Sequence, residues 1–233
     1  MVTGLLASLV FSGCAAPRAA QAVASPATAV VVAPVLNLSN SSDWDPLKVT
    51  DIVASELQSF PDVVVVPVNR TLAALSLTGK TIVETPQDAL DLAAALGADA
   101  TLVTAITEYD AYYPPRLGVV MQWYARRPEE PRAGLDPVAA SRQAADIGPP
   151  PTPPGETQPA VQVQRVYDAA HAAVLDDVRA YARRRGGHGS PYGWRLYVKS
   201  QEHFIRYCCW ASIRSMLLAE EPARTESPAD EAR

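Results

Sequence analysis

The residues best suited to chemistry are two adjacent cysteines, Cys208 and Cys209, with His203 five residues before the first of them. A thiol near an imidazole could be a nucleophile with its base, but offsets of five and six residues put these groups on different faces of a helix. A zinc site would need further ligands at suitable spacing, and none follow. The pattern favours two buried thiols that pack as small apolar groups, and it predicts no metal ion and no other cofactor.

Other candidate catalytic groups have ordinary explanations. Asp176 and Asp177 could be paired carboxylates, but Arg179 at helical distance and the basic residues that follow are typical of a solvated helix face. His171 and His188 have no partner at ligand spacing, and no glycine-rich phosphate-binding motif occurs. We therefore expect a protein that is not an enzyme. The alternative is an enzyme whose site is built from residues far apart in the sequence.

A third cysteine, Cys14, has a different setting. It follows an apolar run, Leu5 to Phe11, and two small residues, which is the outline of a short export signal. The segment FSGC resembles the bacterial lipobox, in which a signal peptidase cuts before a cysteine whose thiol receives diacylglycerol. The resemblance implies a signal peptide over residues 1–13 and a palmitate-bearing lipid on Cys14. Residues 14–28 would then be the lipidated cysteine and a flexible tether.

Two features depart from the lipobox pattern. Phe11 stands where an aliphatic residue is usual, and no basic residue precedes the apolar run. We expect a start placed downstream of the natural one; the alternative is an apolar amino terminus that is never cleaved. The run is too short to span a bilayer, so the chain would attach to the membrane through lipid. Ala15 in place of Asp resembles lipoproteins sent to the outer membrane, which implies its periplasmic face as the location.

Composition and charge limit the remaining possibilities. The chain has 233 residues, 48% of them hydrophobic, which is enough to bury a core. A formal net charge of −5 disfavours a nucleic-acid partner, because that would require a basic surface. Many of the 21 prolines lie in residues 125–160, which we expect to be a disordered insertion. Residues 220–233 read as a disordered acidic tail, which leaves 29–124 and 161–219 as one domain.

Hydrophobic periodicity assigns the elements of this domain. The predicted strands are 29–38, 62–68, 101–109, 117–124 and 161–168. The first two are continuous apolar runs typical of strands buried on both faces, while 117–124 alternates and should pair antiparallel with its predecessor. Pro34 predicts a bulge or an edge position within the first strand.

Helices are predicted between these strands. Asp45 and Pro46 begin one that ends near Phe60, and Thr85 and Pro86 begin another that Gly97 ends. We also expect a short helical turn at 69–75 and two further helices at 168–184 and 201–218. The fold class is therefore α/β, with a mixed sheet of about four to five strands flanked by helices.

This order of elements resembles a domain found in several bacterial envelope proteins. Together with the segments VVVAPVLNLS and LGADATLVTAITEYD, it is similar to the amino-terminal α/β domain of three proteins: the curli-secretion lipoprotein, the penicillin-binding-protein activator lipoprotein and the Tol-system propeller protein. The resemblance covers about residues 29–168 and includes no catalytic motif. It implies a domain that recognises proteins or assembles into envelope structures. The proline-rich segment and the two closing helices depart from the pattern.

An aromatic cluster is the best candidate for a binding surface. Tyr109, Tyr112, Tyr113 and Arg116 surround two prolines, and tyrosine and arginine are enriched at protein interfaces. The alternative is that the tyrosines cover the edge of the core beside Trp123. A second cluster is open to the same two interpretations; it comprises Tyr192, Trp194, Arg195 and Tyr197.

These observations predict a lipid-anchored, non-catalytic envelope protein that binds another protein or assists envelope assembly. Two alternatives stay open: an envelope enzyme with a dispersed site, and a homo-oligomeric structural component.

Overall fold

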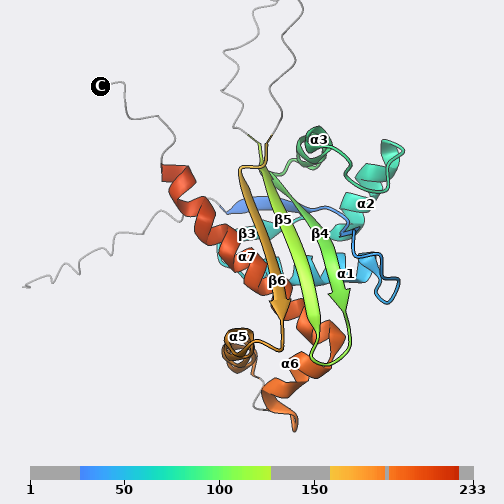
Figure 1. Cartoon of the computed structure of the whole chain (residues 1–233). Coiled ribbons are helices and arrows are strands. Elements are labelled where there is room, and N and C mark those ends of the chain that lie inside the picture. Colours follow the sequence, from blue (N-terminus) through green and yellow to red (C-terminus); the bar gives the residue numbers. More distant parts are fainter. Residues whose placement is uncertain (1–26, 127–157, 187–188, 226–233) are drawn as a thin grey trace, which may run out of the picture.

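One twisted sheet organises the domain (Figure 1). The computed structural model describes residues 27–126, 158–186 and 189–225, with side chains described as far as Ala219. Strands follow the order β3-β1-β4-β5-β6, and a short β2 also pairs with β4. Their bounds are β1 Thr28–Val32, β2 Leu36–Asn37, β3 Val63–Val65, β4 Ala100–Asp110, β5 Arg116–Ala125 and β6 Val161–Asp168. The first four pair in parallel, whereas β5 and β6 join antiparallel.

Helices lie on both faces of this sheet. The first face is covered by α1 (Pro46–Leu57), α5 (Ala172–Arg184), α6 (Leu196–Lys199) and α7 (Gln201–Thr225). The second face is covered by α2 (Val68–Leu77) and α3 (Pro86–Leu96). The predicted fold class is confirmed; the sheet has six strands because the short β2 adds to the expected five.

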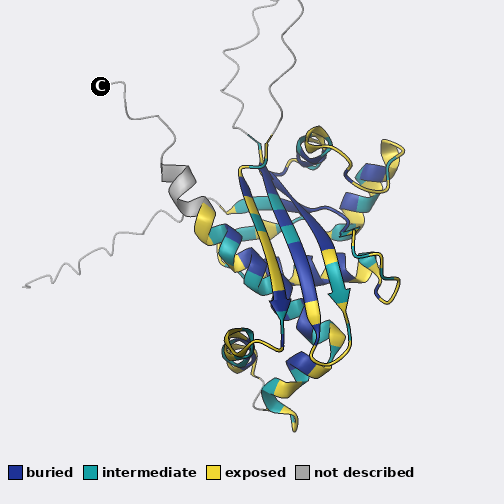
Figure 2. Cartoon of the chain, viewed as in Figure 1, coloured by how far each residue is buried: buried dark blue, intermediate teal, exposed yellow. Residues whose placement is uncertain are grey.

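The two faces of the sheet differ in how far they are covered (Figure 2). On the first face Leu102, Met121 and Trp123 are buried against α1 and α7, and this is the main core. On the second face a smaller core joins α2 and α3 to β1, β4 and Tyr124 of β5. Beyond it, Gln122 donates a hydrogen bond to Gln162 on β6 at 3.0 Å. Apolar residues of β5 on the first face are buried in the main core, whereas Gln122 lies on the second face beyond the smaller core. Apolar and polar residues therefore alternate along β5.

The first predicted strand is interrupted at Pro34. Pairing in β1 stops at Val32 and resumes at Leu36, because proline has no N–H to donate to the ladder. The next free N–H, that of Val35, donates to the hydroxyl of buried Thr50 on α1 at 2.9 Å. Strand β1 lies between β3 and β4, whereas β2 after the interruption pairs with β4 only, which agrees with the expected bulge or edge position at Pro34.

The second predicted strand is an edge strand of three residues, not a buried one. Val64 of β3 is 56% exposed, because β3 has a neighbouring strand on one side only. The chain turns into α2 at Val68, where a full helix replaces the short turn that we expected.

Local signals place the other helix ends well. Asp45 accepts a hydrogen bond from the Leu47 N–H at the start of α1, and Thr85 and Asp88 form a capping box at the start of α3. Gly97 ends α3 with a φ of 66°, in the left-handed region. Helix α7 continues to Thr225 and so includes the first six residues of the expected tail, which was predicted to begin at residue 220.

Several sequence-based expectations fall outside the described residues. They concern the signal peptide, Cys14 with nearly all of its tether, most of the proline-rich insertion, and residues 226–233. Among the helices that the structure describes, none combines the length and apolar character that crossing a bilayer requires.

Candidate functional site

The hairpin between β4 and β5 holds two exposed tyrosines at its end. Tyr112 is 84% exposed and Tyr113 is 70% exposed. The Tyr112 N–H donates to Asp110 Oδ1 at 2.9 Å, which fixes the start of the turn. Strands β4 and β5 are paired up to this turn, which fixes the backbone from which both rings extend. Figure 1 shows the hairpin end projecting from the sheet between β4 and β5.

Arg116 lies on the same hairpin but is already paired. Its Nε is 3.2 Å from Glu108 Oε1, across the two strands. Both side chains are close to half exposed, so this ion pair orients the guanidinium and leaves it accessible. The pairing register of β4 shifts between Ile106 and Glu108, which is a β-bulge next to this ion pair.

Tyr109 is separated from the other tyrosines and turns towards the main core. Its ring packs against Trp44, with centroids 6.2 Å apart. Its hydroxyl is buried and has no hydrogen-bond partner among the described residues. Burial and the nearby Asp43 carboxylate raise the pKa of this hydroxyl. Of the predicted cluster, the structure therefore brings Tyr112, Tyr113 and Arg116 to the hairpin end and places Tyr109 beside α1.

A hollow of about 170 Å³ lies beside Tyr109, between α1 and the start of α7. Of its four charged groups, three have structural partners: Asp45, Lys48 and Glu202. Asp45 caps α1, and Lys48 pairs with Glu202 at 3.1 Å. The hydrogen bond from Lys48 lowers the pKa of Glu202, so this carboxylate stays ionised and is a poor proton donor. Lys48 and Glu202 are therefore held in an ion pair and are not a free acid and base pair.

The second predicted aromatic cluster is divided between surface and core. Tyr192 is 63% exposed, while Tyr197 is buried and contacts the Tyr181 ring edge to face at 5.4 Å. Trp194 lies between two guanidinium groups, those of Arg179 at 4.4 Å and Arg195 at 5.1 Å. Trp194 and Tyr197 therefore pack the segment around the start of α6 against α5.

The two adjacent cysteines pack within the core as small apolar groups. Cys208 and Cys209 are free, buried thiols. Burial raises the pKa of Cys208 well above its usual value and that of Cys209 to about 12, so both stay protonated. His203 Nδ1 is 2.9 Å from the Ser200 hydroxyl, and His171 precedes α5. No group of three or more potential ligands that could hold a metal ion occurs within residues 27–126, 158–186 and 189–225.

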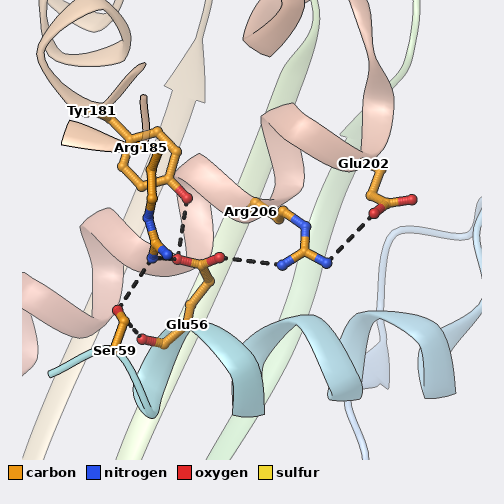
Figure 3. Close-up of polar contacts among 6 residues, drawn as sticks. All are labelled: Glu56, Ser59, Tyr181, Arg185, Glu202 and Arg206. Carbon is orange, nitrogen blue, oxygen red and sulfur yellow. Dashed lines mark hydrogen bonds and ion pairs between the residues drawn. The ribbon is translucent and has the colours of Figure 1, made fainter. Parts of the chain in front are cut away.

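The sequence did not reveal a buried carboxylate, Glu56 of α1, which is 2% exposed (Figure 3). Arg185, which directly follows α5, and the Tyr181 hydroxyl, at 3.1 Å, donate to Glu56 Oε2, and Arg206 of α7 donates to Oε1 at 3.3 Å. Burial, followed by the Glu56 charge, raises the pKa of Tyr181, which keeps its hydroxyl proton for this bond. The network joins α1, α5 and α7.

A signal for Glu56 was present in the sequence. Positions 49, 52, 53, 56 and 57 form one helical stripe, and Glu56 is its single charged member. Because a buried carboxylate needs charged or hydrogen-bonding partners, arginines on later helices could have been expected to face it.

Comparisons with known proteins concern the fold. No protein-family model matches the sequence, and neither does any curated protein. Among solved structures, the C-terminal domain of LpoB from Salmonella enterica is 20% identical, covers 44% of this chain and 76% of that chain, and has a TM-score of 0.36. Lipoprotein GNA1162 from Neisseria meningitidis is 17% identical, covers 54% and 99%, and has a TM-score of 0.35.

A third solved structure covers more of this chain. The hypothetical protein CT253 from Chlamydia trachomatis is 11% identical, covers 85% of this chain and 95% of that chain, and has a TM-score of 0.35. The predicted resemblance to bacterial envelope lipoproteins is confirmed as a similarity of fold.

Proposed function

We propose that this chain is a lipid-anchored protein of the bacterial cell envelope that binds another protein through the β4–β5 hairpin end and catalyses no reaction. The observation that supports the proposal is that Tyr112 and Tyr113 are both exposed at the end of the hairpin that the paired strands β4 and β5 form. Tyrosine offers a large apolar ring and a hydroxyl at low conformational cost, and it is frequent among residues that dominate binding energy.

The position of the hairpin supports this role for an anchored protein. Strand β1, which follows the proposed tether, aligns in parallel with the start of β4. The 11-residue β4 then extends to the hairpin, so at about 3.3 Å per residue the two ends are roughly 33 Å apart. A chain held at its amino end would present the tyrosines at the far end of the sheet, away from the bilayer.

The anchor and location rest on the first residues of the chain. We propose that Cys14 is lipidated and that the mature protein lies on the periplasmic face of the outer membrane, because FSGC resembles a lipobox and Ala15 follows it. In cells labelled with palmitate, the native chain should incorporate label and Cys14→Ala should not. An unlabelled native chain in the soluble fraction would contradict the anchor.

Pulldown from detergent-solubilised envelope tests the binding role. The native chain should recover a stoichiometric second protein, and Tyr112→Ala with Tyr113→Ala should reduce recovery at least about tenfold, which corresponds to about 1.4 kcal/mol. Leu77→Ala is the control, because Leu77 is 89% exposed and lies on α2. Adding Arg116→Ala to the double variant tests whether the Arg116 guanidinium contributes to binding of the second protein.

Other outcomes would favour the alternatives. Recovery of this chain alone would indicate a homo-oligomeric component. Equal recovery with the tyrosine variant and the control would contradict the hairpin interface.

A further inference from the structure

A cleft of about 240 Å³ lies between β6, α5 and α7. Arg165 comes from β6, Arg184 from α5 and Arg214 from α7, so residues far apart in the sequence meet there. Trp210, Asp177 and Ser215 also line it. The cleft is distinct from the hairpin end and plays no part in the proposed protein binding.

The cleft concentrates positive charge on an acidic protein. Three guanidinium groups and one carboxylate leave an excess of two positive charges, whereas the whole chain has a formal net charge of −5. Two other arginines are paired, Arg179 of α5 with Asp176, and Arg185, directly after α5, with Glu56. Among the described residues, no carboxylate lies within ion-pair distance of the three cleft arginines.

Trp210 orders two of these arginines without neutralising them. The Cζ atoms of Arg184 and Arg214 lie 5.7 Å and 5.6 Å from the centre of its ring. A cation–π contact uses the flat face of a guanidinium and leaves the N–H groups at its edge free to donate. The indole is itself held by Tyr181 at 5.0 Å and Phe60 at 6.4 Å.

We propose that this cleft binds a phosphate group, either free or as the headgroup of an anionic phospholipid. A phosphate monoester has close to two negative charges at neutral pH and three acceptor oxygens, which match the charge excess and the three separate arginines. A carboxylate carries only one negative charge and would leave half of the charge excess unbalanced. The Ser215 hydroxyl, also in the cleft, donates to the Ala211 carbonyl at 3.0 Å, so the guanidinium groups supply the donors for the phosphate.

Titration calorimetry with inorganic phosphate at constant ionic strength tests the site, using the full chain with Cys14→Ser so that no lipid is attached. Arg184→Gln with Arg214→Gln should weaken phosphate binding at least tenfold. Arg183→Gln with Arg195→Gln removes the same charge from exposed residues outside the cleft and should leave binding unchanged. Thermal unfolding of both variants checks that each is folded, and Arg165→Gln provides a second variant on β6.

Sedimentation with vesicles distinguishes the two sources of phosphate. The same proteins are mixed with phosphatidylcholine vesicles that contain or lack phosphatidic acid. A preference for phosphatidic acid that disappears only in the cleft variant identifies a lipid headgroup, whereas calorimetric binding without that preference identifies a free or small-molecule phosphate. The proposal is overturned if neither probe binds, or if cleft and control variants lose binding equally.

Discussion

At the scale of single residues, Glu56 is the side chain on which the helical layer most depends. Removing one partner of a buried ion pair leaves the other charges unsatisfied and typically costs about 3–5 kcal/mol. Arg185 and Arg206 are each about one third exposed, so water can solvate them in part. We therefore expect Glu56→Gln to lower the free energy of unfolding by about 3 kcal/mol, as measured in urea at pH 7.

Glu202 offers a matched control for this prediction. It also contacts Arg206, at 3.5 Å, but its side chain is 40% exposed. Glu202→Gln should therefore cost less than about 1 kcal/mol. Equal losses in the two variants would show that burial of Glu56 is not what matters.

The adjacent cysteines also yield a prediction at this scale. Only a thiolate attacks a disulfide reagent, and burial raises the pKa of both thiols far above neutrality. With Cys14→Ser, the folded chain should not react with Ellman's reagent at pH 8, and two thiols should react once urea unfolds it. Rapid reaction of the folded chain would mean that α7 is less tightly packed than the structure shows.

At the scale of elements, the β4 bulge depends on a glycine in the neighbouring strand. A Cβ on Gly118 of β5 would lie 2.7 Å from Thr107 Oγ1 and 3.1 Å from the backbone nitrogen of Glu108. The backbone atom cannot move away without disturbing the bulge, so Gly118→Ala should destabilise the protein by about 1–3 kcal/mol. Thermal unfolding would measure the loss.

Gly189 tests whether this effect is steric. A Cβ there has no neighbour within 4 Å, so Gly189→Ala should leave the melting temperature nearly unchanged. If both substitutions behave alike, the contact at the bulge is not the cause.

At the scale of the whole molecule, the proline-rich insertion joins two strands that are already paired. Strand β5 ends at Ala125 and β6 begins at Val161, and the Ala160 N–H donates to the Trp123 carbonyl at 2.8 Å. Replacing residues 127–157 with a short Gly-Ser turn should therefore preserve the fold. Each halving of a loop's length lowers its closure cost by about 0.6 kcal/mol, so stability in urea should rise by about 1–2 kcal/mol. A large loss would show that the insertion packs on the domain.

Much of the fold was predictable because its signals are local. Capping residues act on backbone groups within four residues of themselves. The ends of α1 and α3 could therefore be placed from nearby residues in the sequence, namely the N-caps Asp45 and Thr85 and the C-cap Gly97. Alternation in β5 likewise reports which side of that strand meets the core. The sequence left open whether Tyr112 and Tyr113 are exposed or cover the edge of the core, and the structure shows that both are exposed.

The sequence by itself determined the α/β class, the helix boundaries at Asp45 and Thr85, and the exclusion of a recognisable catalytic motif. Only the tertiary structure decided that β3 is an exposed edge, that Tyr109 turns to Trp44 while Tyr112 faces solvent, and that three arginines meet around Trp210. The reason is physical. Capping and periodicity depend on residues a few positions apart, whereas burial and charge pairing depend on which distant segments become neighbours when the chain folds.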